Sequence, residues 1–279
     1  MKRLPLACTV RGCGQPLERT PLTWTCPRGH SFDIARAGYV NLLQPQDRRS
    51  MEAGDARSAV DARARLFERG IGQHVIDAVV SAITTTGDIH SRSVVAELGS
   101  GTGHLLDAVH ARFGAHCIGI DLAIRAVEIA ARRASSVQWV VANADRRLPL
   151  LDGRVDLLLS INARRNPSEA ARVLTPEGRL LVGIPADDDL IELREAVQGG
   201  AMARERVGQL VDEHSTHFSV VGRSSVRETR TCAKESLEDL LLGTYRGGRH
   251  ANAARVSALE TLEVTLATEL VEFRRLPSV

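Results

Sequence analysis

The chain has 279 residues, with 36 Lys and Arg against 34 Asp and Glu, and five cysteines. This length allows one large domain, or one domain with an appendage. No apolar stretch approaches the roughly 20 residues that span a bilayer, and the N-terminus lacks the apolar region of a secretion signal. An odd number of cysteines is a poor disulfide scaffold, so we expect a reducing compartment, the cytoplasm, and no membrane partner.

Positive charge is concentrated near the N-terminus. Residues 1–50 contain eight basic and three acidic side chains, so the rest of the chain carries a net negative charge. All basic residues except Lys2 and Lys234 are arginines, whose guanidinium groups suit bidentate contacts with phosphate. A charge excess of this size is usually an ordinary solvated surface, and a nucleic-acid partner is the alternative.

Three of the five cysteines lie in the first 26 residues, in a segment rich in Gly, Pro and Thr. They form, with one histidine, two ligand pairs separated by twelve residues, a spacing that suits the tetrahedral ligands of a structural zinc ion. The alternative is three buried thiols beside a surface histidine. We expect one structural Zn²⁺ bound by Cys8, Cys13, Cys26 and His30.

Beyond the zinc ligands, a helical pattern covers about residues 58–82 and leads into alternating strands and helices. This alternation predicts a parallel sheet covered by helices on both faces. We expect strands at 93–98, 116–121, 137–144, 155–162 and 179–185, with helices from 103, at 122–134 and at 168–174. After residue 185 we expect helices at 189–198, 201–214 and 235–245 and strands at 217–231 and 262–275.

The first expected strand ends in a glycine-rich loop, and a helix follows it at once. Glycines let the backbone turn sharply and leave room for a ligand at a helix N-terminus. A dinucleotide fold would place its third glycine where His104 stands, whereas GxGxG after an acidic residue resembles the S-adenosylmethionine loop of Rossmann-like methyltransferases. We therefore expect the cofactor to contact Glu97, Gly99, Ser100, Gly101, Thr102, Gly103 and His104.

The ends of the next two strands support the same ligand. Asp121 ends the second strand, followed by Leu122, and its carboxylate can accept both ribose hydroxyls of a nucleoside. A cap for the helix that follows is the alternative role of Asp121. Asn143, Ala144 and Asp145 follow the third strand, where methyltransferases of this class hold the adenine ring.

Together these residues resemble the 23S rRNA guanine-N1 methyltransferase family over nearly the whole chain. The matching segments are 26–33, 37–43, 97–103 and 169–174. The resemblance implies an α/β fold, a Rossmann-like class I S-adenosylmethionine-dependent methyltransferase domain with a small N-terminal zinc-binding domain. Within the family, the branch that confers resistance to tylosin-type macrolides looks most similar.

The resemblance also implies the division of the chain and its partner. We expect a zinc-binding RNA-recognition domain at 1–38, a linker and helical lead-in at 39–90, and the methyltransferase domain at 91–279. The implied partner is a hairpin loop of 23S rRNA, and the sequence leaves a homodimer open. The basic residues expected to contact this RNA are Arg28, Arg36, Arg48 and Arg49.

The chain departs from the family pattern near the reacting atoms. Residues 162–164 read Asn-Ala-Arg where Tyr-Ala-Pro is common, and four residues instead of two separate the first cysteines. Gly72 stands where the family has an aromatic residue near the methionine end of the cofactor, and Asp189 replaces a cofactor-side histidine. We carry the cofactor-binding role over to Asp189, and to Gly72 through its backbone.

Guanine N1 carries a proton at neutral pH, so we expect a group that removes this proton or stabilises the deprotonated base. Asp189 is our candidate for this base. Asn162, after the fourth strand, is our candidate for orienting the guanine, with a strand cap as its alternative role. Two other functions stay open: a methyltransferase of small metabolites, for which a zinc unit is superfluous, and a non-enzymatic RNA-binding zinc protein, which the intact glycine loop argues against.

Overall fold

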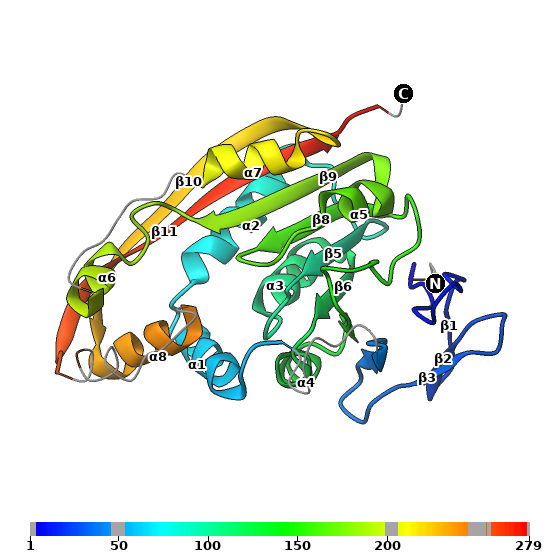
Figure 1. The fold of residues 1–279 in the computed structure, drawn as a ribbon, viewed down its shortest axis with the longest axis horizontal. Coiled ribbons are helices and arrows are strands. Elements are labelled where there is room, and N and C mark those ends of the chain that lie inside the picture. Colours follow the sequence, from blue (N-terminus) through cyan, green and yellow to red (C-terminus); the bar gives the residue numbers. More distant parts are fainter. Residues whose placement is uncertain (1–3, 46–53, 199–205, 245–254, 256–257, 278–279) are drawn as a thin grey trace.

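The computed structural model describes residues 4–45, 54–198, 206–244, 255 and 258–277 (Figure 1). Within them, one large twisted sheet has the strand order β10-β11-β9-β8-β5-β6-β7-β4. Five of its strands form the parallel centre: β5 (Val94–Leu98), β6 (His116–Asp121), β7 (Gln138–Val141), β8 (Val155–Ile161) and β9 (Leu174–Pro185). The other three are the antiparallel pair β10 (Phe218–Ala233) and β11 (Thr261–Arg275) and the short edge strand β4 (Val40–Asn41).

The strand order places a topological switch point between β5 and β8. From β5 the chain moves outward to β6 and β7, then returns to β8 and moves outward to β9 on the other side. Ligands of open α/β sheets bind at such a point, outside the carboxyl ends of the strands. The glycine loop after β5 and Asn162 after β8 therefore lie at the same edge of the sheet.

The helices agree with the sequence pattern at most positions, and one helical pattern is divided in two. The helical pattern at 58–82 forms two helices, because Gly70 and Gly72 have φ of +75° and +101° and break it. These two are α1 (Arg57–Glu68) and α2 (Gln73–Thr86). The others are α3 (His104–Phe113), α4 (Ile124–Arg133), α5 (Pro167–Val173), α6 (Ile191–Gln198), α7 (Val207–His214) and α8 (Lys234–Thr244).

Some expected boundaries also differ. The third strand ends at Val141 instead of 144, and the fifth begins at Leu174, because Leu174 already pairs with Val155 of β8 before an irregularity that precedes Arg179. Residues 201–205 of the helix expected at 201–214, and Tyr245 of the helix expected at 235–245, lie outside the described residues. No helix in the described ranges has the length and apolarity needed to cross a membrane.

The zinc-ligand segment is built into the core of the large sheet. Its small sheet consists of β1 (Glu18–Arg19), β2 (Thr23–Thr25) and β3 (Ser31–Asp33), and the segment after it adds β4 to the edge strand β7. One face of the large sheet packs against α2, α3 and α4. The opposite face packs against α5, α7 and apolar side chains of the N-terminal segment, among them Leu6, Leu17 and Trp24. The N-terminal unit thus covers part of a sheet face that would otherwise be exposed to water.

Candidate cofactor site and metal centre

The glycine loop is held in a shape that only glycine adopts readily. Gly99, Gly101 and Gly103 all have positive φ, between +53° and +84°. A Cβ at Gly99 would lie 2.4 Å from the Cβ of Ala163, and one at Gly103 would lie 2.6 Å from the Trp139 ring. A Cβ at Gly101 would meet no atom within 4 Å. Close packing therefore explains why positions 99 and 103 have no side chain, whereas Gly101 borders open space beside the N-terminus of α3.

Asp121 joins this loop to the end of the second central strand. Its Oδ2 accepts the N–H of Gly101 at 2.8 Å, and its Oδ1 accepts the N–H of Ala123 at 2.8 Å. Burial raises the pKa of Asp121 despite these two backbone hydrogen bonds, which lower it. Ala123, not Asp121, occupies the N-cap position of α4, so the carboxylate supports the helix start from two residues earlier. Leu122 is partly buried against the core.

Two buried polar atoms beside the loop lack a partner. Glu97 is 4% exposed, and burial, together with the negative charge of Asp121, raises its pKa to about 8. Within the described residues, neither the Oε2 of Glu97 nor the Oγ of Ser100 makes a hydrogen bond. Buried polar groups are normally satisfied, so a polar ligand at this position would supply the missing partners. Open space over Gly101 and unpaired polar atoms beside it fit S-adenosylmethionine.

An aromatic stack closes the site on the side of α1. The His104 ring stacks on Phe67 with a centroid distance of 4.3 Å and an interplanar angle of 17°, and its Nδ1 lies 3.0 Å from the Thr102 hydroxyl. Burial lowers the pKa of His104 to about 4, so the imidazole is neutral at physiological pH. A Cβ at Gly72 would lie 2.9 Å from the Phe67 ring. Phe67 therefore places an aromatic ring beside Gly72, a contact that the sequence analysis missed.

The residues expected near the adenine lie on the loop after β7. The Oδ1 of Asn143 accepts the N–H of Asp145 at 2.9 Å, and Ala144 is partly buried. The Asp145 carboxylate accepts a hydrogen bond from Arg164 at 2.9 Å, which ties the loop after β7 to the loop after β8. The adenine contact of Asp145 stays a prediction.

The two candidate catalytic residues follow neighbouring strands. Asn162 has φ of +53°, an unusual backbone conformation for a residue other than glycine, and its N–H donates to the Gly183 carbonyl at 2.8 Å. Its exposed side chain lies beyond the end of β8. Asp189 follows β9, accepts the N–H of Ala267 at 2.9 Å, and has its pKa raised by burial to about 6. Their catalytic roles stay predictions.

The four expected zinc ligands converge. Their donor atoms all lie within 4.8 Å of one another. The Nδ1 of His30 is 3.4 Å from the Sγ of both Cys8 and Cys26, and the Sγ atoms of Cys13 and Cys26 are 3.8 Å apart. Two thiolates bound tetrahedrally at 2.3 Å from zinc would be separated by about 3.8 Å. These separations and the Cys3His donor set fit a structural zinc ion.

Among the arginines expected to contact RNA, Arg28 donates to the Gly12 carbonyl at 3.1 Å and is exposed on the zinc-ligand segment. Arg36 is also exposed, and Arg48 and Arg49 lie outside the described residues.

Comparisons with known proteins agree with both parts of this architecture. Residues 7–51 match the zinc-ribbon family described as "RlmA, N-terminal", and residues 95–178 match a methyltransferase domain family. The chain is 32% identical over 270 residues, 95% of each chain, to a 23S rRNA (guanine(748)-N(1))-methyltransferase of Streptomyces fradiae. It is also 32% identical over 294 residues to a putative 23S rRNA (guanine-N(1)-)-methyltransferase of Micromonospora griseorubida, covering 96% of this chain and 97% of that one.

The chain belongs to the 23S rRNA (guanine-N1)-methyltransferase family. Its fold is that of class I methyltransferases, and its cofactors are S-adenosylmethionine and one zinc ion. The predictions of the family, the fold and the cofactors are therefore confirmed. A putative methyltransferase of Bacillus halodurans is similar in fold, with a TM-score of 0.52 and 15% identity over 71% of this chain and 99% of that one. A Haloferax volcanii methyltransferase complex gives a TM-score of 0.54 at 17% identity, covering 79% and 97%.

We predict one zinc ion per chain, and its loss in Cys26→Ser. Because the N-terminal unit covers one face of the large sheet, zinc loss should also lower the thermal stability of the methyltransferase core. Elemental analysis and thermal unfolding measure the two effects. Cys232→Ser, at a buried cysteine outside the cluster, should keep its zinc. A folded, active wild-type protein without zinc would contradict the assignment.

We predict that Asp121→Ala weakens S-adenosylmethionine binding by about tenfold or more, the scale of losing charge-assisted hydrogen bonds. Calorimetry on the purified protein measures the dissociation constant. Asp77→Ala, which removes an exposed carboxylate bonded to Gln73 on α2, serves as the control and should bind normally. Unchanged affinity in Asp121→Ala, or binding of NAD in its place, would show that the ligand is assigned wrongly.

Proposed function

We propose that this chain transfers the methyl group of S-adenosylmethionine to N1 of a guanine in a hairpin loop of 23S rRNA, in the cytoplasm, and thereby raises resistance to tylosin-type macrolides. The observation that carries this proposal is the near-complete match to relatives named for that reaction, which runs through zinc ribbon and catalytic domain alike. Demethylmenaquinone methyltransferases of Tropheryma whipplei, by contrast, match only 32% of the chain.

The cofactor supplies an electrophilic methyl group on a sulfonium, and the protein must hold the acceptor nitrogen in line with it. The glycine loop and Asp121 position the nucleoside, and Glu97 and Ser100 hold polar groups of the cofactor with their unpaired atoms. The stack of Phe67 on His104 excludes water from one side of the site.

The guanine is oriented and deprotonated from the ends of β8 and β9. Asn162 lies at the end of β8, and its amide group can hydrogen-bond to a guanine edge. Asp189 takes the N1 proton, and its raised pKa makes it a stronger base than an ordinary aspartate. The target base leaves its stack to reach these groups, which a hairpin loop allows at lower cost than a duplex.

The rRNA contacts the zinc-binding unit and the adjoining loops of the core. Arg28 is exposed on that unit, and Arg147, from the loop after β7, lies against Gly14. Arg164, after β8, continues this basic surface toward the strand ends where the target base is held. Contacts of this kind position an RNA by its phosphates and do not depend on its sequence.

We predict that expression in a host lacking the modification produces one new N1-methylguanine in 23S rRNA. The methyl group removes a Watson–Crick donor, so reverse transcriptase should stop once at the modified base, and tolerance to tylosin should rise. Nucleoside mass spectrometry identifies the product, with Asp121→Ala as the inactive control. Any of four results would contradict the proposal: a methylated adenine, a stop outside 23S rRNA, methylation of free metabolites with rRNA untouched, or RNA binding without methyl transfer.

We predict that kcat/KM for an rRNA hairpin rises with pH through about 6 and then levels, because Asp189 acts only when ionised and burial raises its pKa. In Asp189→Asn, kcat/KM should no longer rise with pH through about 6, and the rate should fall at least about 100-fold. Glu192→Gln is the matched control, because Glu192 accepts the Thr265 N–H of β11 just as Asp189 accepts that of Ala267. Full activity in Asp189→Asn would exclude it as the base.

A further inference from the structure

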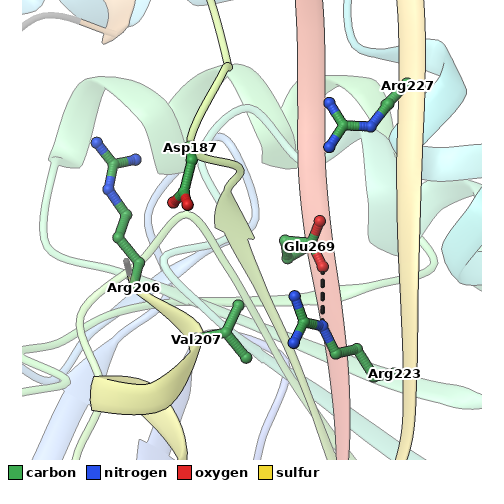
Figure 2. Close-up of a pocket in the computed structure, with 6 residues that line it drawn as sticks. All are labelled: Asp187, Arg206, Val207, Arg223, Arg227 and Glu269. Carbon is green, nitrogen blue, oxygen red and sulfur yellow. Dashed lines mark hydrogen bonds and ion pairs between the residues drawn. The ribbon is translucent and has the colours of Figure 1, made fainter. Parts of the chain in front are cut away.

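A small charged cavity lies at the same edge of the sheet as Asn162 and Asp189 and is used by none of the steps above. Its volume is about 170 Å³, below the ~300–1,000 Å³ typical of pockets for drug-sized ligands, so it suits a small group. Figure 2 shows arginines entering from two sides, with two carboxylates between them. The lining residues are Asp187, Arg206, Val207, Arg223, Arg227 and Glu269.

The arginines retain donors for a further acceptor. The Nε of Arg223 donates to Glu269 at 3.0 Å, Arg227 donates to Asp188, and the Nη1 of Arg206 donates to the Pro185 carbonyl at 3.2 Å. Each guanidinium has five N–H groups, so these contacts hold the side chain in place and leave other N–H groups for an anion.

The guanidinium groups of the cavity reach solvent. The Arg223 and Arg227 side chains are 57% and 49% exposed. The exposed pair of Arg227 with Asp188 contributes only about 0–1 kcal/mol, whereas the Glu269 partner of Arg223 is 10% exposed. Arg179, on the opposite face of the sheet, shows the contrasting structural case. It is 2% exposed and donates to Asp88, Glu272 and Thr86. The cavity arginines are arranged for a ligand that comes from solvent.

The position of the cavity connects it to the reacting base. Asp187 lies two residues after β9, and Asn162 is bonded through its N–H to Gly183 of the same strand. The four residues from Gly183 to Asp187 span at most about 14 Å, a distance that a few nucleotides of single-stranded RNA cover. Val207 begins α7 at the cavity, and a helix N-terminus favours a negative group.

We propose that this cavity binds one backbone phosphate of the rRNA strand, within a few nucleotides of the target guanine. The proposal rests on the proposed function. The phosphate accepts bidentate hydrogen bonds from Arg223 and Arg227, with Arg206 closing the other side. Glu269 holds Arg223 and Asp188 holds Arg227 before the RNA arrives, so the site is formed in advance and positions the strand for methyl transfer.

Methylation kinetics on a 23S rRNA hairpin test the site in the full-length, zinc-loaded protein. The double variant Arg223→Gln/Arg227→Gln should raise KM about tenfold and leave kcat within about twofold. A plot of the logarithm of RNA affinity against the logarithm of salt concentration should become less steep by about 0.7, the contribution of one phosphate contact on a single strand. Arg274→Gln is the control. That side chain is 46% exposed on β11 and reaches Glu177 at 4.0 Å, so its loss should change KM by less than about twofold.

Folding defects are separated from lost RNA contacts in two ways. Each variant should bind S-adenosylmethionine normally, and a variant that leaves no buried carboxylate unpaired should unfold at the wild-type temperature. Because Arg223→Gln leaves Glu269 without its partner, Arg223→Gln/Glu269→Gln removes the pair together and should still raise KM. Wild-type KM and salt slope in these variants would overturn the site.

The identity of the anion is tested with hairpins that carry one uncharged methylphosphonate at successive positions. At one position near the target guanine, the methylphosphonate should weaken RNA binding by the wild-type protein. The same methylphosphonate should not weaken RNA binding by Arg223→Gln/Arg227→Gln any further, because this variant already lacks the phosphate contact. Additive losses at every position would contradict the site. A wild-type protein that methylates no rRNA contradicts the proposed function, whereas normal methylation by the arginine variants contradicts only the phosphate site.

Discussion

The Asp121 carboxylate determines the geometry on which the whole site depends. By accepting the N–H groups of Gly101 and Ala123, it fixes the glycine loop after β5 against the end of β6 and the start of α4. Positive φ at three glycines makes this loop shape accessible without strain. Glu97 lies buried beside it with a raised pKa, and within the described residues its Oε2 makes no hydrogen bond, so a polar ligand at the loop would supply the missing partner.

The zinc-binding unit and the catalytic sheet act as one structure. Leu6, Leu17 and Trp24 share a core with the sheet face opposite α2, α3 and α4, and β4 extends its edge. Zinc therefore stabilises more than its own hairpins. A unit fixed in this way can hold RNA at a constant distance from the methyl group, which a freely hinged appendage could not do.

Local spacing explains what the sequence predicted and what it missed. Glycine, aspartate and cysteine patterns depend on neighbours within one loop or hairpin, so the cofactor loop and metal ligands were recognisable. The stack of Phe67 on His104 and the pairing of Asp145 with Arg164 join segments that meet only in the folded chain. The cavity combines residues from Asp187 to Glu269, and no spacing along the chain marks them as a group.

A crystal structure with S-adenosylhomocysteine tests the central claim most directly. The account predicts the ribose hydroxyls on the Asp121 carboxylate, the adenosyl group over Gly101, and the amino-acid end of the ligand beside Glu97 and Ser100. The homocysteine sulfur should point toward the ends of β8 and β9. A ligand bound away from Asp121, or a sulfur directed away from Asn162 and Asp189, would contradict it.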